Sequence, residues 1–295
     1  MLRARIWGRN MIFDFDDFDV RDRFYSIEEK AEQLRMAVDT LKPEQQNTFN
    51  EFCAQAYIFH DSALEGLVVS GDEIASVFST DTDGQYIRSR VLQEIRNHRR
   101  KLSEMISHAV RIRHSNAVYR SAEINIEQVL ATHEALYENV PRKEPGKLRN
   151  QMPLHIAYFH DLIDAKLVKD RLLSLCEKTR DPEFRTQHPI NQAVLFHFYF
   201  MQIFPFMDGC GKVGRLFMNS FLLQGGYELA IIHGSERQHY YETLRDGPEA
   251  LRLLLLDSID SALDSRANFL RDIDLSKSTG RVIFKKAKSL EQPYV

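Results

Sequence analysis

A short segment near residue 210 combines glycines, an acid and two bases in a spacing that suits phosphate chemistry. Residues 204–215 read FPFMDGCGKVGR and lie between two stretches with helical hydrophobic spacing. Gly209 and Gly211 therefore fall just before a helix N-terminus, where positive φ angles let successive backbone N–H groups converge on one anion. The helix dipole adds to that attraction. The segment predicts a phosphate-binding loop.

The charged side chains of this segment extend the prediction. Lys212 and Arg215 are three residues apart on the first turn, so they share a face and can neutralise further phosphate charge. Asp208 stands at the edge of the loop and suits a magnesium ion that bridges phosphates. The run G-x-x-x-x-G-K-[ST] is absent, so this is no Walker loop. An ordinary glycine-containing connection between helices is the alternative.

Helices must position this loop, because the hydrophobic spacing along the chain is helical and nothing resembles a large sheet. Ser70 and Glu73 have the spacing of a capping box. Residues 141–160 are irregular and predict at most a short hairpin. We expect helices over 27–41, 43–64, 70–78, 86–113, 124–139, 164–179, 188–203, 212–224, 235–246 and 249–272. The expected fold class is all-α.

The composition constrains the class of binding partner and the cellular compartment. The 295 residues carry a net charge of -3, which gives no global field for nucleic acid. The three cysteines are distant and odd in number, which argues against disulfides or a zinc cluster and fits a reducing compartment. No apolar run reaches the roughly 20 residues of a membrane helix, and the start lacks the apolar stretch of a signal peptide. We expect a cytoplasmic location.

Residues 204–215 resemble the signature of the Fic (Fido) family, H-P-F-x-[DE]-G-N-G-R-x-x-R. The preceding residues 188–198 resemble the lead-in to that motif. Further similar segments are Asn125–Tyr137 (the opening helix), Pro145–Arg149 (the start of a β-hairpin flap) and Arg237 with Tyr240, Tyr241 and Leu244. These matches keep the family's order from about residue 124 to 265. The resemblance implies a helical N-terminal region at 1–120, a Fic core with a small hairpin flap at 121–272, and a basic tail at 273–295.

The resemblance also implies an activity and its groups. Fic proteins transfer AMP from ATP to a Ser, Thr or Tyr hydroxyl of a protein, with Mg2+. The resemblance implies that the phosphates are bound by Gly209, Cys210, Gly211, Lys212 and Arg215, and that Mg2+ is bound by Asp208. Fic-type transfer of another phosphate-containing group is an alternative. The protein target and the oligomeric state stay open.

Residues 61–66 resemble the inhibitory helix of the family, [ST]-x-x-x-E-[GN], on a helix over about 44–66. The resemblance implies that Glu65 pairs with Arg215 and blocks the γ-phosphate position. Asp61 stands where Ser or Thr is usual. An exposed glutamate at a helix end is the alternative interpretation.

Three positions depart from the signature. Phe204 replaces the catalytic histidine and cannot accept a proton, whereas positioned acid–base catalysis contributes about 10²–10⁴-fold. Cys210 replaces an asparagine with a weak donor, and Lys212 replaces an arginine, so the bidentate fork is lost. The histidines that sequence cannot place are His133, His155, His188, His233 and His239, and His197 lies about two turns upstream of the loop.

We therefore expect an impaired or inactive AMP-transferase-like protein that retains the fold and binds a nucleotide. The alternative is an active adenylyltransferase with an unusual base. Cys210 at a helix N-terminus is either a reactive thiol or an inert small residue.

Overall fold

The structure is a computed structural model that describes residues 16, 18–79, 89–113, 123–153 and 162–279. Helices make up its regular elements, as the hydrophobic spacing predicted. In chain order they are η1 (Phe18–Val20), α1 (Arg21–Asp39), α2 (Pro43–Leu64), α3 (Gly71–Ser79), α4 (Arg90–Arg113), α5 (Ile126–Tyr137), η2 (Ala165–Leu167), α6 (Val168–Lys178), α7 (Pro182–Arg185), α8 (Pro189–Ile203), α9 (Cys210–Gln224), η3 (Gly234–Glu236), α10 (Arg237–Asp246) and α11 (Pro248–Thr279).

The expected helices are present, with differences at their ends. The capping box of α3 is confirmed, since the Glu73 carboxylate accepts from the Ser70 backbone N–H at 2.9 Å and the Ser70 hydroxyl accepts from the Glu73 N–H at 3.2 Å. The last helix runs on to Thr279, beyond the expected end at 272. Residues 141–153 form turns and no strand; the rest of the expected hairpin, 154–161, lies outside the described residues.

Two helices form the centre of the molecule. α8 begins with Pro189 at its first turn, where a missing N–H costs nothing. Its residues are buried on every side from Ile190 to Ile203, and α9 is buried along almost its whole length. A helix that is apolar all round belongs in a core. Both ends of the loop at 204–209 are therefore fixed by central helices.

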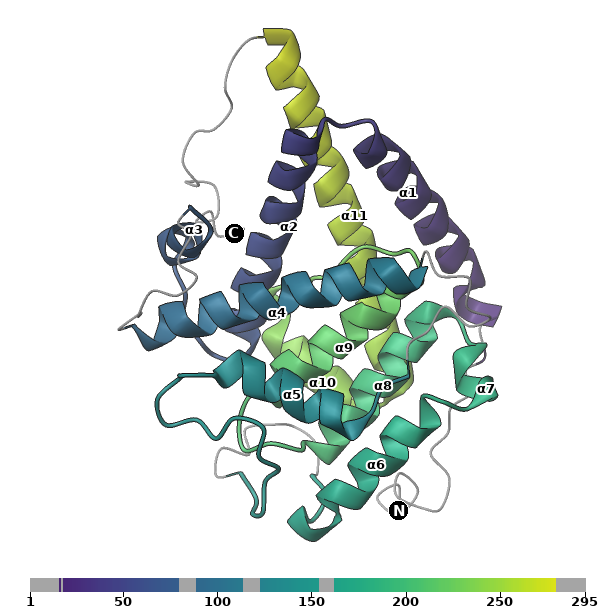
Figure 1. Cartoon of the computed structure of the whole chain (residues 1–295). Helices are drawn as coiled ribbons and strands as arrows, with labels where there is room; N and C mark the ends of the chain where they lie inside the picture. The colour runs from purple at the N-terminus through teal and green to yellow at the C-terminus, as the bar shows by residue number, and fades with distance from the viewer. Residues whose placement is uncertain (1–15, 17, 80–88, 114–122, 154–161, 280–295) are drawn as a thin grey trace.

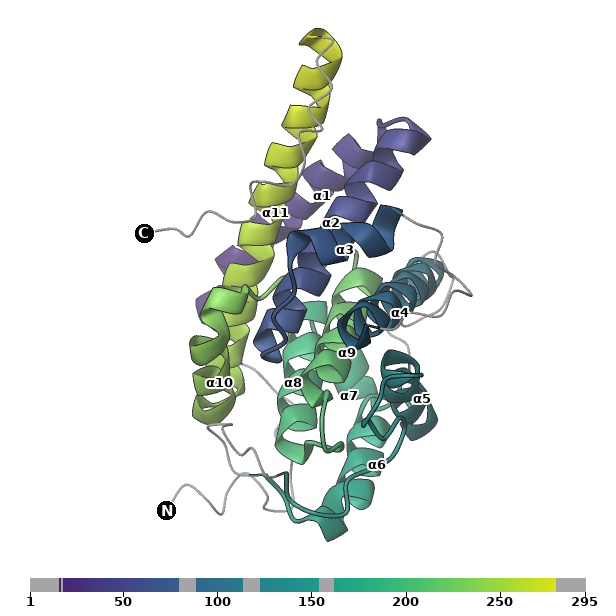
Figure 2. The same cartoon turned by 90° about the vertical axis from the view of Figure 1, so that its left-hand side faces the viewer.

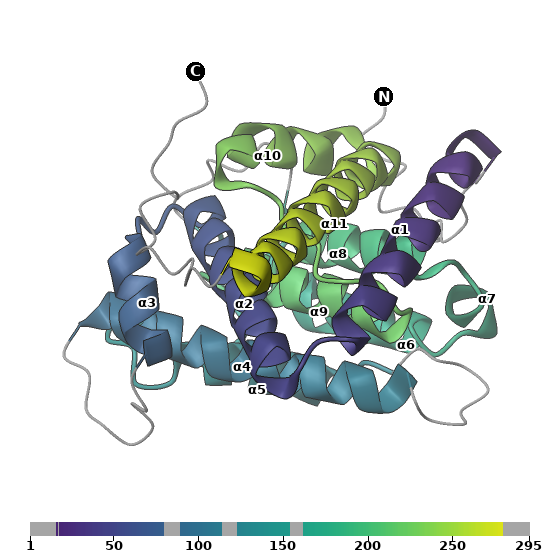
Figure 3. The ribbon, with the colours of Figure 1, turned by 90° about the horizontal axis from the view of Figure 1, so that it is seen from above.

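The other helices enclose this pair. α4 and α5 cover one side of α8 and α9, while α10 and α11 cover the opposite side (Figure 2). α4 crosses α9 directly (Figure 1), and α1 and α2 flank α11 (Figures 1 and 3). One continuous hydrophobic core joins the helices before and after residue 120, from Val20 to Leu270. No helix in the described part of the chain has both the length and the apolar character that a bilayer span needs.

Candidate functional site

The loop between α8 and α9 has a fixed backbone. α8 ends at Ile203, and its C-cap Phe204 adopts left-handed backbone angles (φ 48°). α9 begins at Cys210, with Gly209 as its N-cap (φ 74°). The predicted helix–loop–helix is confirmed. One detail was wrong: Gly211 lies inside the first turn of α9 and has no positive φ, because the helix starts two residues earlier than the expected 212. Only Gly209 requires the freedom of a glycine backbone.

Arg149 holds the back of this loop. Its guanidinium donates to the carbonyls of Phe204 at 2.6 Å, Ile203 at 3.1 Å and Ile163 at 2.7 Å. Its backbone N–H donates to Pro205 O at 2.9 Å. A helix end leaves carbonyls without helical partners, and here one side chain satisfies those at the end of α8. Burial of Arg149 lowers its pKa below the usual arginine value.

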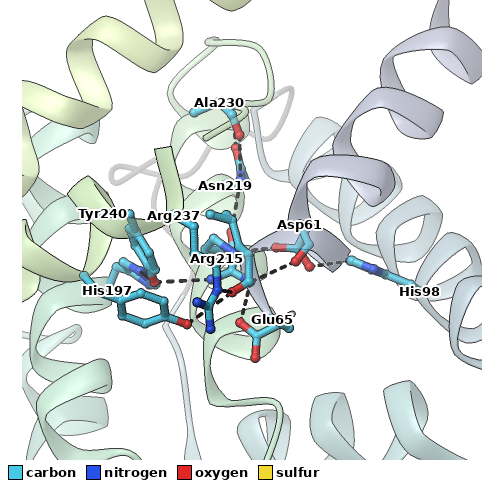
Figure 4. A network of polar contacts seen from close by, with 11 residues as sticks. Asp61, Glu65, His98, His197, Arg215, Asn219, Ala230, Arg237 and Tyr240 are labelled. Carbon is cyan, nitrogen blue, oxygen red and sulfur yellow. Dashed lines mark hydrogen bonds and ion pairs between the residues drawn. The ribbon is translucent and has the colours of Figure 1, made fainter. Parts of the chain in front are cut away.

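Arg215 is held by two carboxylates, that of Asp61 in α2 and that of Glu65, the C-cap of α2 (Figure 4). Its side chain is 2% exposed. Nε donates to Asp61 Oδ1 at 2.5 Å and Nη2 donates to Glu65 Oε1 at 2.7 Å. Burial alone would lower the pKa of Arg215, but Asp61, Tyr240 and Glu65 raise it well above its usual value. The predicted contact between Glu65 and Arg215 is confirmed; the part of Asp61 was not predicted.

The C-terminal end of α2, next to these two carboxylates, is hydrogen-bonded to α10. Arg237 Nε donates to Leu64 O at 2.8 Å, and the Tyr241 hydroxyl donates to the same oxygen at 3.3 Å. Gly66 follows with a φ of 76° and turns the chain away. The C-terminal carbonyls of α2 are thereby satisfied, and Glu65 is held over the start of α9.

Lys212 also has an acidic partner already. Its ammonium lies 3.4 Å from Glu94 Oε2 on α4, and both side chains are almost fully buried. Glu94 in turn accepts from Arg90 Nε at 3.0 Å. Burial acts to raise the pKa of Glu94, but Lys212 and Arg90 lower it below the usual value. Lys212 therefore faces α4 rather than presenting a free charge beside Arg215.

Asp208, the expected magnesium ligand, is paired with a lysine. Its Oδ2 forms an ion pair with Lys143 Nζ, and the lysine side chain is the more buried of the two. The same ammonium lies 5.0 Å from the centroid of the Tyr137 ring. Burial lowers the pKa of Lys143 to about 8, although Glu94 acts in the opposite direction.

The space beside the two glycines is filled by side chains. A methyl group added at Gly211 would overlap the carboxylate of Glu65, and one added at Gly209 would overlap the Tyr137 ring. Within the described part of the chain, no three acidic, histidine or cysteine side chains are placed to hold a metal ion. In this arrangement the residues assigned to ATP and Mg2+ do not fit that pair, because each of their charges is already compensated from within the protein.

His133 is excluded as a replacement base by its hydrogen bonds. Nδ1 accepts from the Gly146 N–H at 2.9 Å, so Nε2 carries the proton that it donates to Asp208 O at 3.1 Å. The ring stacks on Phe206 with centroids 3.8 Å apart. Burial lowers the pKa of His133 to about 3. The imidazole is structural and neutral.

Of the remaining histidines weighed from sequence, His197 and His188 are engaged away from the loop. His197 is fully buried with Nε2 2.8 Å from the Tyr240 hydroxyl, and burial lowers its pKa to about 3. His188 caps the start of α8 and contacts Glu28 at 3.2 Å. His233 and His239 are exposed, and His155 lies outside the described residues.

Cys210 is an inert group. Its Sγ accepts from the Phe206 N–H at 3.2 Å and donates to Phe206 O at 3.3 Å, and burial raises its pKa well above the usual thiol value. A buried, protonated thiol is a poor nucleophile. The reactive-thiol alternative therefore finds no support.

Sequence reasoning missed four members of this site: Asp61 as a ligand of Arg215, and Glu94, Tyr137 and Lys143. Asp61 carried a signal, since a carboxylate one turn before Glu65 must lie on the same helix face. Glu94 and Lys143 carried none, because nothing in their local sequence distinguishes them from other charged residues.

Comparison with known proteins identifies the domain around the loop. Residues 123–222 match the model of the Fic/DOC family. Protein adenylyltransferase fic-1 of Caenorhabditis elegans is 24% identical over 229 residues, 77% of this chain and 40% of its own length. Protein adenylyltransferase Fic of Drosophila erecta is 28% identical over 194 residues, 64% of this chain and 36% of its own length. The chain thus spans about 40% or less of these two relatives.

Solved structures share the fold. Fic-1 from C. elegans superposes with a TM-score of 0.65 at 17% identity, over 84% of this chain and 71% of that one. A Fic domain containing signaling protein from Bacteroides thetaiotaomicron gives 0.62 at 16% identity, over 90% and 99%. The helical arrangement of this chain is therefore that of Fic proteins, and the match to the Fic/DOC family model lies on residues 123–222.

Proposed function

We propose that this protein is a Fic-fold pseudoenzyme, which keeps the nucleotide-binding framework of the family and does not transfer AMP. One observation carries the proposal. The position that the family gives to its catalytic histidine is held by Phe204, whose side chain is 1% exposed and packed in the core. A phenyl ring neither accepts nor donates a proton, so the hydroxyl of a target protein meets no base there.

Two described histidines near Phe204, His133 and His197, are poorly suited to replace the missing base. The ring nitrogens of His133 are both engaged in hydrogen bonds, and the Nε2 of His197 is engaged with Tyr240. Their pKa values of about 3 make both imidazoles very weak bases. Acid–base catalysis works best when the pKa of the base is near the working pH, and neither group meets that condition.

Nucleotide binding, in this proposal, is conditional on movement of α2. Arg215 becomes available to an anion only when Asp61 and Glu65 release it. The relatives named adenylyltransferases support a nucleotide as the ancestral ligand. The protein would then act through contacts with a protein partner, in the reducing cytoplasm that its buried free cysteines suit.

AMP transfer from radiolabelled ATP to lysate proteins tests the proposal. We expect no transfer above background by the natural sequence. Phe204→His supplies a base, and Cys210→Asn with Lys212→Arg supplies the lost phosphate contacts; each variant is made in the Glu65→Gly background. Because transfer needs both a base and an aligned phosphate, the triple restoration should exceed Phe204→His alone by roughly tenfold or more.

The control and the contradicting result both use Asp208. Asp208→Ala should abolish any activity that the restored variants gain, because transfer with Mg2+ in those variants requires Asp208 to exchange Lys143 for the metal ion. Robust transfer by the natural sequence that Asp208→Ala abolishes would overturn the proposal and favour an active adenylyltransferase with an unusual base.

A further inference from the structure

The turn after α5 places Lys143 at the edge of the loop. Lys143 lies with its side chain 10% exposed, and its ammonium forms an ion pair with Oδ2 of Asp208, which is 45% exposed. The ammonium also faces the Tyr137 ring at 5.0 Å, a cation–π contact. The lysine is therefore the enclosed partner, and Asp208 reaches inward to meet it.

The backbone around this turn adopts positive φ angles at residues that are not glycine, which indicates that surrounding contacts hold its conformation. Among the described residues, three that are not glycine have a positive φ: Asn139 (57°), Arg142 (64°) and Phe204 (48°). Two of them lie in the turns between α5 and Lys143, and the third begins the loop itself. Such conformations cost free energy and persist where surrounding contacts hold them, commonly at functional sites.

We propose that the ammonium of Lys143 is the resident cation of Asp208 and holds the place of the divalent metal ion that Fic proteins bind there. The inference deepens the proposed function, on which it rests for the assignment of Asp208 as the metal position. It follows that a phosphate-containing ligand of this loop binds without a metal at Asp208.

The charges around the ammonium explain why a metal ion is excluded. A cation bound to Asp208 would lie next to the positive charge of Lys143, with those of Lys212 and Arg90 acting on the same place. It would also leave the largely buried Lys143 without its ion-pair partner, which is unfavourable. Glu94 acts on this place with the opposite sign, but it is shared between Lys212 and Arg90, so it offsets only part of the positive charge.

Binding of Mn2+ alone, measured by calorimetry and by water-proton relaxation, tests the proposal without any nucleotide. Lys143→Met removes the charge but keeps the length and a side chain that packs well on Tyr137. We expect Mn2+ binding by the natural chain to be below detection. Lys143→Met should show weak binding, roughly millimolar, as a single carboxylate supports, and this binding should be lost in Lys143→Met with Asp208→Asn.

Lys147→Met is the matched control. Lys147 lies four residues further on, is 71% exposed and forms an ion pair with the nearby Glu144. Its loss should leave Mn2+ binding unchanged. Lys143→Gln serves as a second neutral variant if Lys143→Met does not fold.

Two results would overturn the inference: Mn2+ binding by the natural chain that Asp208→Asn abolishes, or folded neutral variants of Lys143 that gain no Mn2+ affinity. Neither result depends on AMP transfer, so failure of this inference is distinguishable from failure of the pseudoenzyme proposal.

Discussion

At the scale of single residues, Arg215 decides whether the loop can receive an anion. Its guanidinium donates to two carboxylates, one turn apart on α2, and contacts the Tyr240 hydroxyl at 3.3 Å. The two carboxylates more than neutralise the single positive charge of the buried guanidinium. Its positive charge is therefore unavailable to a phosphate, and removing one acid leaves the other in place.

Asp61 should be the stronger half of this clamp. We expect Glu65→Gly alone to raise ATP affinity only slightly, because Nε stays bound to the fully buried Asp61. Adding Asp61→Ser, which restores the hydroxyl that the family has there, should raise the affinity by roughly a further tenfold, since charged hydrogen bonds are strong and the arginine then lacks an acid. Calorimetry with ATP measures both steps. A full gain from Glu65→Gly alone would show that Asp61 is no part of the clamp.

The same residue should matter for stability. Removal of one partner from a buried ion pair destabilises strongly, and because Glu65 remains we expect Asp61→Ala to lower the free energy of unfolding by about 2 kcal/mol. Asp61→Asn is the matched control, because its amide oxygen still accepts from Arg215 Nε. Urea denaturation should place it between the natural chain and Asp61→Ala.

At the scale of elements, the loop depends on how α8 ends. The left-handed residue Phe204 stops the helix, and Arg149 takes the carbonyls that the ending leaves free. Arg149 also donates to the carbonyl of Ile163, which connects the loop to the segment before α6. One side chain thus fixes the angle at which the chain leaves α8 and enters the loop.

Arg149→Lys tests this dependence. A lysine keeps the charge but has no planar fork, so it leaves at least one buried carbonyl without a donor. We expect the free energy of unfolding to fall by about 2 kcal/mol, the penalty of an unsatisfied buried group. Arg142→Lys, at an exposed position of the same segment, should change it by less than about 0.5 kcal/mol. Equal losses in the two variants would mean that Arg149 is not a specific cap.

At the scale of the whole molecule, buried histidines make the fold sensitive to acid. His98, His133 and His197 are all at most 3% exposed. Burial lowers their pKa values to about 4, 3 and 3. Unfolding returns each to an ordinary value near 6.5, so between these limits the unfolded chain binds more protons than the folded one. Stability must therefore fall as the pH falls below about 6.5.

The slope of that loss can be measured. With three such histidines, the slope of the free energy of unfolding against pH approaches about 4 kcal/mol per pH unit between pH 6 and 4. Urea denaturation at a series of pH values should show it. His197→Gln, which can still pair with Tyr240, should reduce the slope by roughly a third. A stability that is flat from pH 6.5 to 5 would contradict the assignment of these histidines as neutral in the fold.

The sequence by itself determined the helices, the position of the loop and the phenylalanine at the place of the family's histidine. Hydrophobic periodicity reports which face of a helix is buried, so α8 and α9 were predicted with small errors at their ends. Phe204 needed no structure, because the chemistry of a phenyl ring is the same wherever it lies. Gly209 was also assigned correctly, since a glycine between two helical patterns indicates a turn.

Only the tertiary structure decided which charges meet. Arg215 and Asp61 are 154 residues apart in sequence, and Lys212 and Glu94 are 118 apart. The pairing of Lys143 with Asp208 likewise depends on how one turn packs against a distant loop. Periodicity along a chain carries no information about such contacts, because an ion pair depends on distance in space and on exclusion of water.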